Sequence, residues 1–112
     1  MKVNYKPTGT SRQNSPKQWE VWLADAAFGG AKKRCAVLVD KRTPQGYSVY
    51  EIIPLSLKGA KDVLITDLDR AGQDRPSAVR ITSSAVLQNN AFVMRLGSLC
   101  NEDISKIITS RN

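Results

Sequence analysis

Residues 34–54, RCAVLVDKRTPQGYSVYEIIP, contain two apolar segments on either side of a turn. Cys35–Val39 is a short continuous apolar run, which is typical of a strand buried on both faces. Thr43–Gly46 carries proline and glycine where a type I turn favours them, so the chain is expected to reverse into Tyr47–Pro54. This part of the sequence therefore predicts a β-hairpin made of the second and third strands.

Further short strands are predicted on both sides of this hairpin. The apolar run Glu20–Asp25 has the pattern of a first strand, and a basic, glycine-bearing loop follows at residues 28–33. The elements predicted after the hairpin are brief strands at 63–65, 77–81 and 92–96, a polar surface loop at 67–75, and a single helical turn at 82–88.

The end of the chain has the clearest helix pattern. Asn101 can cap the helix, two acidic residues follow at its positive end, and Ile104, Ile107 and Ile108 fall on one face. We expect this face to cover the sheet. Short strands, close turns and one closing helix predict a mainly β fold with a C-terminal helix, arranged as a small, partly open β-barrel.

Length and charge predict one basic domain preceded by an arm. The 112 residues carry a net charge of +7, which favours partners such as nucleic acid, acidic peptides or anionic lipid. Residues 1–17 contain four basic residues, no acidic residue and almost nothing to bury, so we expect a flexible basic arm there. Residues 18–112 are predicted to form a single domain.

Composition also excludes several kinds of chemistry. The chain has no histidine, which removes histidine-based hydrolase mechanisms and the commonest metal ligand. Cys35 and Cys100 are not at metal-ligand spacing, and the aspartates between residues 62 and 74 lack regular spacing. We therefore expect no metal and no cofactor. No run of 18 apolar residues and no secretory signal is present, so no membrane partner and a cytoplasmic location are expected.

The best candidate binding residues lie in and after the first loop. Gly29–Lys33 offers flexible backbone amides beside two lysines, and Arg34 opens a strand predicted to be buried. A guanidinium fixed in this way can form a bidentate pair with phosphate oxygens, although an exposed loop arginine remains an equal alternative. Trp19 and Trp22 could stack on bases, but a role in the core is favoured.

The order of these segments resembles the PemK/MazF-like toxins of bacterial toxin–antitoxin systems. The resemblance covers about residues 19–108. It rests on the first strand, the basic loop with Arg34, the ending Ile53–Ser56, the segment Ala71–Arg80 and the segment Leu96–Leu99 before the final helix. It implies an SH3-like β-barrel of the PemK/MazF/CcdB type, a homodimer, and a metal-independent endoribonuclease that cuts single-stranded RNA. It also implies a cognate antitoxin protein as a partner.

The resemblance assigns roles to individual residues. Arg34 takes the place of the catalytic arginine, and Ser56 takes the place of the catalytic hydroxyl residue after a strand. Lys32 and Lys33 would bind flanking phosphates, and Phe28, Gly29 and Gly30 would complete the loop that lines the RNA groove. Two positions depart from the family pattern: Cys35 stands where proline is usual, and Ser56 stands where threonine is usual.

Two other functions remain open on the sequence. One is a non-catalytic relative that binds RNA or an antitoxin and keeps Arg34 only as a phosphate clamp. The other is a gyrase-directed toxin of the CcdB type, which acts through its C-terminal helix. The ending ITSRN, residues 108–112, lacks the Trp-Gly-Ile finish of that type.

Overall fold

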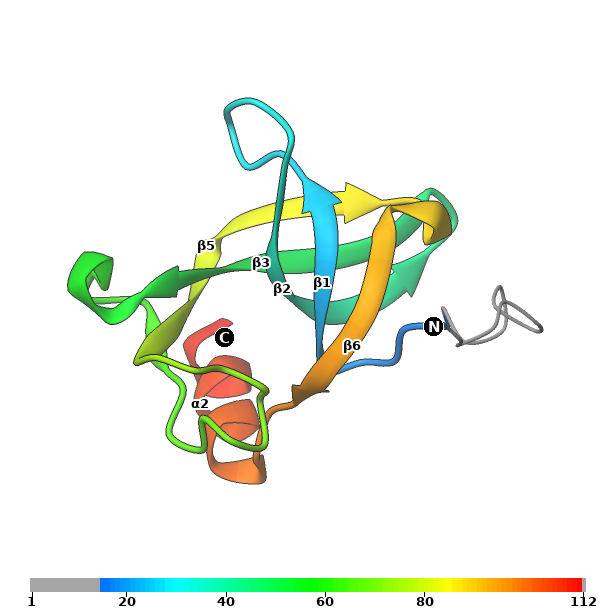
Figure 1. The fold of residues 1–112 in the computed structure, drawn as a ribbon. Helices are drawn as coiled ribbons and strands as arrows, with labels where there is room; N and C mark the ends of the chain where they lie inside the picture. The colour runs from blue at the N-terminus through cyan, green and yellow to red at the C-terminus, as the bar shows by residue number, and fades with distance from the viewer. Residues whose placement is uncertain (1–14, 112) are drawn as a thin grey trace, which may run out of the picture.

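The computed structural model describes residues 15–111, and these form a mainly β fold with one C-terminal helix (Figure 1). The elements are β1 (Glu20–Ala26), β2 (Lys33–Thr43), β3 (Gly46–Pro54), the 3₁₀ turn η1 (Leu55–Leu57), β4 (Val63–Leu64), β5 (Ser77–Leu87), the 3₁₀ turn η2 (Asn89–Ala91), β6 (Phe92–Ser98) and α2 (Asn101–Arg111). The predicted fold class is confirmed at this level.

All six strands belong to one antiparallel sheet in the order β4-β5-β3-β2-β1-β6. The predicted β2–β3 hairpin lies at its centre, with Val39 opposite Val49 and Thr43 opposite Gly46. The middle of β2 is fully buried, as a continuous apolar run predicts. The hairpin therefore carries the core of the molecule.

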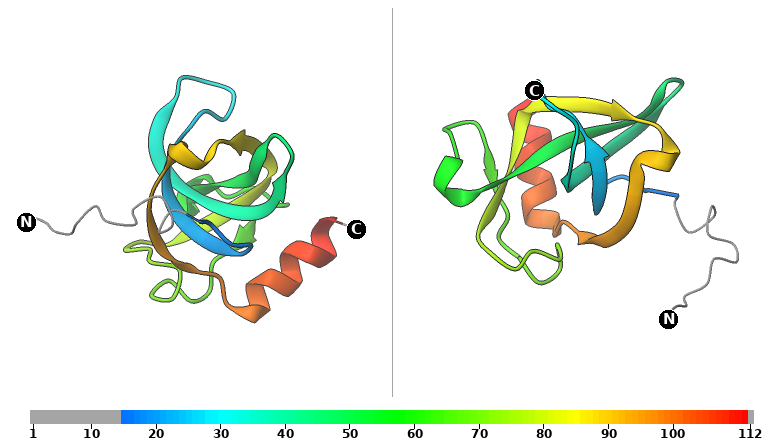
Figure 2. Two further views of the ribbon diagram at one scale, coloured as in Figure 1. Left: turned by 90° about the vertical axis from the view of Figure 1, so that its right-hand side faces the viewer. Right: turned by 45° about the horizontal axis from the view of Figure 1, so that its top comes forward.

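The sheet does not close into a barrel, and of the predicted partly open β-barrel the structure shows a single antiparallel sheet that stays open. Within residues 15–111, β4 pairs only with β5 and β6 pairs only with β1, so the sheet keeps two edges. β2 and β3 pair with each other from Val37 and Glu51 to the Thr43–Gly46 turn. On the other side of Val37 and Glu51, β2 pairs with β1 and β3 pairs with β5. The two central strands separate there, and the sheet curls strongly without joining its edges (Figure 2).

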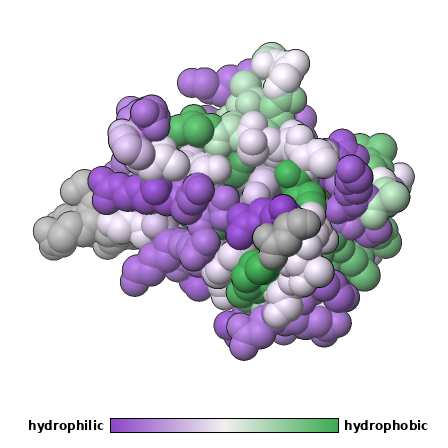
Figure 3. All heavy atoms as spheres, turned by 180° about the vertical axis from the view of Figure 1, so that it is seen from behind, coloured by the Kyte–Doolittle hydropathy of each residue, from purple (hydrophilic) through white to green (hydrophobic). Residues whose placement is uncertain are grey.

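The curled sheet is buried on both faces, which explains why neighbouring residues of one strand serve different cores. Val21 and Leu38 pack in a cluster with Ile107 of α2, whereas Trp22 and Val37 pack in a second cluster away from the helix. Seen from behind, the surface is mostly hydrophilic and apolar side chains show only in scattered patches (Figure 3).

Two local predictions were wrong. Where a helical turn was expected at residues 82–88, residues 82–87 belong to β5, which pairs with β3 as far as Tyr47 and Leu87. Pairing with a neighbouring strand outweighs the weak local preference of this polar segment. In α2, Ile107 is buried and Ile104 is half-buried, but Ile108 is 43% exposed and does not cover the sheet.

Asp103 takes the place expected for Ile108 as a buried anchor of α2. This carboxylate is fully buried and accepts hydrogen bonds from the Thr66 backbone N–H, at 2.8 Å, and from the Thr66 hydroxyl, at 2.9 Å. A buried carboxylate needs such partners. The side chain thus fixes the first turn of α2 to the chain that follows β4.

The predicted arm, residues 1–17, lies mostly outside the described residues, so its flexibility stays a prediction. Of its last residues, Pro16 is buried, and Lys17 exchanges two hydrogen bonds with Glu20 at the start of β1. In the part of the chain that the structure describes, we find no helix long and apolar enough to cross a membrane.

Candidate functional site

Arg34 forms a two-point ion pair with Asp25 at the open end of the β1–β2 pair. The two residues are directly opposite in the register, and Arg34 Nε lies 2.9 Å from Asp25 Oδ1 while Nη2 lies 3.2 Å from Oδ2. Both side chains are solvent-accessible, 58% for Arg34 and 36% for Asp25. The hydrogen bond from Arg34 is the main reason that the pKa of Asp25 is lowered, and the same bond raises the pKa of Arg34.

This ion pair leaves one edge of the guanidinium available. A guanidinium has five N–H donors in a planar fork, and Asp25 occupies the side that contains Nε. The opposite side, formed by Nη1 and Nη2, donates to no other group in residues 15–111. Arg34 can therefore keep its bond to Asp25 and still donate two parallel hydrogen bonds to a phosphate.

The loop between β1 and β2 adds two further positive charges. Lys32 and Lys33 are exposed at its end, next to Arg34, and Gly29 and Gly30 are exposed at its tip. Phe28 is half-buried and packs against the core cluster that contains Trp22, so it fixes the start of the loop. The predicted loop residues thus surround one exposed, basic corner of the molecule.

Ser56 lies away from the basic corner around Arg34. It belongs to η1, at the far end of β3, and its exposed hydroxyl makes no hydrogen bond to the described residues. β2 and β3 separate beyond Val37 and Glu51. As a result, Arg34 pairs with β1, whereas the end of β3 pairs with β5. In Figure 1, η1 is well removed from the β1–β2 loop. No hydrogen bond joins Arg34 to Ser56 in this structure.

The other residues that could act at this corner have structural roles. Trp22 is buried in the core and donates its indole N–H to Glu20 at 2.9 Å, so it is not free to stack on a base. Trp19 is half-buried under the guanidinium of Arg111, 5.5 Å from its ring centre. Cys35 is partly buried, and this burial raises the pKa of its thiol. It therefore stays protonated at neutral pH.

Asp25 is the residue that sequence reasoning missed. A signal for it existed: an acid ends the first predicted strand and an arginine opens the next one. Residues that flank a hairpin loop face each other across the two strands, and opposite charges there attract. The register of the pair, which places Asp25 opposite Arg34, would have been needed to use this signal.

No model of a known protein family matches the chain, and no curated protein compared with it is significantly similar in sequence. Among residues 15–111, no group of three or more cysteine, aspartate or glutamate side chains is placed to hold a metal ion.

Proposed function

We propose that this protein is a toxin of a toxin–antitoxin system that cleaves single-stranded RNA without a metal ion. The proposal rests chiefly on one observation: Asp25 holds Arg34 at an exposed, basic corner with one guanidinium edge still available. The resemblance to PemK/MazF-like toxins places the catalytic arginine at the same residue. The net charge of +7 supports an anionic substrate.

The chemistry that we propose needs few protein groups. In RNA the neighbouring 2′-hydroxyl is the nucleophile, so the protein has to align it and stabilise the charge that develops on the phosphate. The Nη1–Nη2 edge of Arg34 would donate to the phosphate oxygens, and Lys32 and Lys33 would hold flanking phosphates. The 2′-oxygen bonds to phosphorus and the 5′-oxygen leaves. The products are a cyclic phosphate and a 5′-hydroxyl.

We include an SH3-like fold and two kinds of protein partner in the same proposal. A curled antiparallel sheet with a C-terminal helix is compatible with an SH3-like relative whose barrel is open on one side. The resemblance further implies a homodimer in the cytoplasm and an antitoxin that covers the basic corner. A basic surface suits an acidic inhibitory segment.

A second function is favoured by the position of Ser56. Because Ser56 lies away from Arg34, the corner holds an arginine and an acid but not the hydroxyl that the resemblance pairs with Arg34. A protein that binds RNA through Arg34 without cleaving it fits this arrangement. Turnover distinguishes the two functions.

The test is incubation of the purified protein with a long single-stranded RNA in EDTA, with the products resolved on a gel. We expect discrete fragments ending in a cyclic phosphate. Arg34→Ala should slow cleavage roughly 10²–10³-fold, because it removes a donor to the transition state. Arg42→Ala is the matched control, since Arg42 is exposed near the other end of β2, where its guanidinium lies 5.6 Å from the centre of the Tyr47 ring.

The outcomes separate the two functions. Cleavage by the parent and by Arg42→Ala, but not by Arg34→Ala, supports the ribonuclease. RNA binding that needs Arg34 but is never followed by cleavage supports the non-catalytic protein. Equal cleavage by all three proteins contradicts the site.

A further inference from the structure

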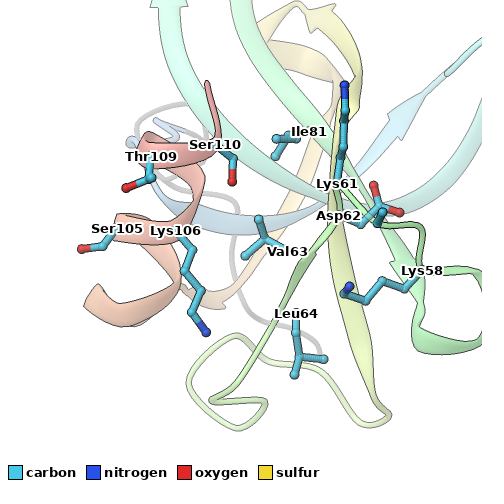
Figure 4. A pocket seen from close by; sticks show the side chains of 11 residues that line it. Lys58, Lys61, Asp62, Val63, Leu64, Ile81, Ser105, Lys106, Thr109 and Ser110 are labelled. Carbon is cyan, nitrogen blue, oxygen red and sulfur yellow. The ribbon is translucent and has the colours of Figure 1, made fainter. Parts of the chain in front are cut away.

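A second basic surface lies in a groove between β4 and α2. Its volume is about 700 Å³, within the range of roughly 300–1,000 Å³ that binding pockets occupy. Val63, Leu64 and Ile81 form its apolar floor, and Ser110 points into it from the helix (Figure 4). This groove shares no residue with the corner around Arg34.

Three lysines surround this groove, and two of them have no acidic partner among the residues that the structure describes. Lys58 and Lys106 extend from opposite walls toward Leu64, and Lys61 stands at one end of the floor (Figure 4). Lys106 pairs with Glu102 at 3.3 Å, an exposed contact that is weak in water. Lys58 contacts only a backbone carbonyl, and Lys61 has no hydrogen bond or ion pair within residues 15–111.

The acidic residue in the groove is already neutralised. Asp62 is buried and pairs with Arg80, with Nε at 3.3 Å from Oδ2. It also accepts a hydrogen bond from the Gly59 backbone N–H at 2.7 Å. The exposed charge of the groove is therefore positive, above an apolar floor.

One wall of the groove is the outer edge of β4, where Leu64 is the residue that can pair with another strand. The Asp62 N–H already donates to the Gly59 carbonyl, and the Thr66 N–H already donates to Asp103. β4 is the last strand in the sheet order and pairs only with β5 among the described strands. The Ile65 N–H donates to the carbonyl of Ser77, the first residue of β5, whereas the following N–H, of Thr66, points the other way and donates to Asp103 of α2. Backbone N–H groups alternate along a strand, so Leu64 directs its N–H to the same outer side as Thr66.

We propose that this groove binds an extended acidic peptide segment of a partner protein, which pairs with the outer edge of β4. The peptide would place apolar side chains on Val63, Leu64 and Ile81 and carboxylates near Lys58 and Lys61. Strand addition of this kind obtains affinity from main-chain hydrogen bonds and specificity from alternate side chains. The proposal does not depend on ribonuclease activity.

The lining favours a peptide over other anionic partners. No aromatic residue lines the groove, so it has no platform for the bases of single-stranded RNA. A membrane surface would reach exposed side chains but would leave the outward backbone group of Leu64 without a partner. A peptide strand is the anionic partner that satisfies the floor, the lysines and the backbone edge together.

The probe is a fluorescent peptide that alternates glutamate and leucine, with anisotropy as the readout on the full chain. We expect saturable binding, weakened about fivefold or more by Lys58→Glu, because an attraction is replaced by a repulsion. Lys41→Glu, on the exposed part of β2, changes the net charge equally and should leave binding within about twofold. Equal affinity of the two variants would overturn the proposal.

Two N-methylated forms of the peptide test the strand pairing itself. Each form is blocked at alternate residues, so one loses the N–H groups that face β4 and the other loses those that face away. We expect one form to lose binding and the other to keep it. Retention by both forms, or binding of anionic lipid vesicles or RNA through Lys58 in place of the peptide, would contradict the proposal.

Discussion

Asp25 and Arg34 face each other across β1 and β2, with two hydrogen bonds of 2.9 and 3.2 Å between their side chains. The pair has opposite consequences for binding and for catalysis. Asp25 fixes the guanidinium in one orientation, but its own negative charge repels a phosphate that approaches Arg34. Removing the charge should therefore separate affinity from turnover.

We expect Asp25→Asn to bind single-stranded RNA roughly twofold to fivefold more tightly, because one repulsive charge is lost at an exposed site. Its cleavage rate should fall about tenfold or more, because Arg34 is no longer held by a charged partner. Filter binding and single-turnover cleavage measure the two effects. Glu102→Gln is the matched control, because Glu102 is 65% exposed on α2, away from the β1–β2 loop (Figure 1). Parallel changes in both variants would show a general charge effect.

The hydrogen bonds of Glu20 predict how the stability of the fold depends on pH. Burial alone would raise the pKa of Glu20, but hydrogen bonds from Trp22 and Lys17, and the bond and charge of Arg95, together lower it. A lowered pKa in the folded state means that ionised Glu20 stabilises the fold above the ordinary glutamate value of about 4.3. This contribution is lost as the pH falls through the lower pKa of the folded protein.

Thermal unfolding at a series of acidic pH values checks the predicted contribution of Glu20 to stability. Glu20→Gln should be less stable than the parent at neutral pH by about 1 kcal/mol or more, because the charged acceptor is lost. The difference should shrink as the pH drops below about 4. Asp74→Asn, at a side chain 93% exposed on the 67–75 loop, should follow the parent at every pH. A pH-independent difference for Glu20→Gln would rule out this assignment.

Gly97 of β6 lies against the backbone of the loop before β5. A Cβ at Gly97 would overlap the carbonyl oxygen of Arg70, and the adjacent Ser98 N–H donates to that same oxygen at 2.9 Å. Gly72 on the loop meets the Leu96 carbonyl in the same way, with φ +69°. Two backbones thus pack directly, and neither has room for a side chain.

We expect Gly97→Ala to destabilise the protein by about 2–4 kcal/mol, because the loop or β6 must move to remove the overlap. Gly30→Ala makes the same chemical change at the open tip of the β1–β2 loop, where a Cβ would meet nothing within 4 Å. That variant should be neutral or slightly stabilising, since alanine restricts the unfolded chain. Denaturant unfolding compares them, and equal stabilities would contradict the packing.

The elements that could be predicted from sequence are those with a strong local pattern. The apolar run of β2, the Thr43–Gly46 turn and the C-terminal helix each depend on neighbouring residues alone, and all three are present. The same holds for the position of Arg34 at the start of a buried strand. Local patterns did not reveal that residues 82–87 extend β5, since β3 determines this pairing.

The arrangement of the site depended on long-range geometry. The register of β1 against β2 brings Asp25 to Arg34, and the separation of β2 from β3 takes Ser56 away from it. Which side chains of α2 are buried also depends on long-range geometry. Ile107 packs against the sheet, and Asp103 accepts a hydrogen bond from the chain after β4. Packing determines strand register and helix orientation, and the periodicity of apolar residues carries no information about this packing.

Arg111 attaches the end of α2 to the sheet. Its Nη1 lies 2.8 Å from Oδ1 of Asp40, a buried residue of β2, and 3.3 Å from the Tyr50 hydroxyl of β3, while the guanidinium covers the Trp19 ring. Removing Arg111 would leave Asp40 without its charged partner. Uncompensated buried charges are costly, so we expect Arg111→Ala to lower stability by about 2–3 kcal/mol, and Trp19 emission to shift to the red as its ring becomes exposed.

The double variant Arg111→Ala, Asp40→Asn separates the ion pair from the cation–π contact. Neutralising Asp40 should recover part of the stability, because the buried charge is no longer unpaired, while the emission shift should persist because the ring is still uncovered. Lys106→Ala, one and a half turns earlier on the exposed side of α2, serves as the control for helix propensity. If Asp40→Asn recovers nothing in the Arg111→Ala background, the link between α2 and β2 contributes little to stability.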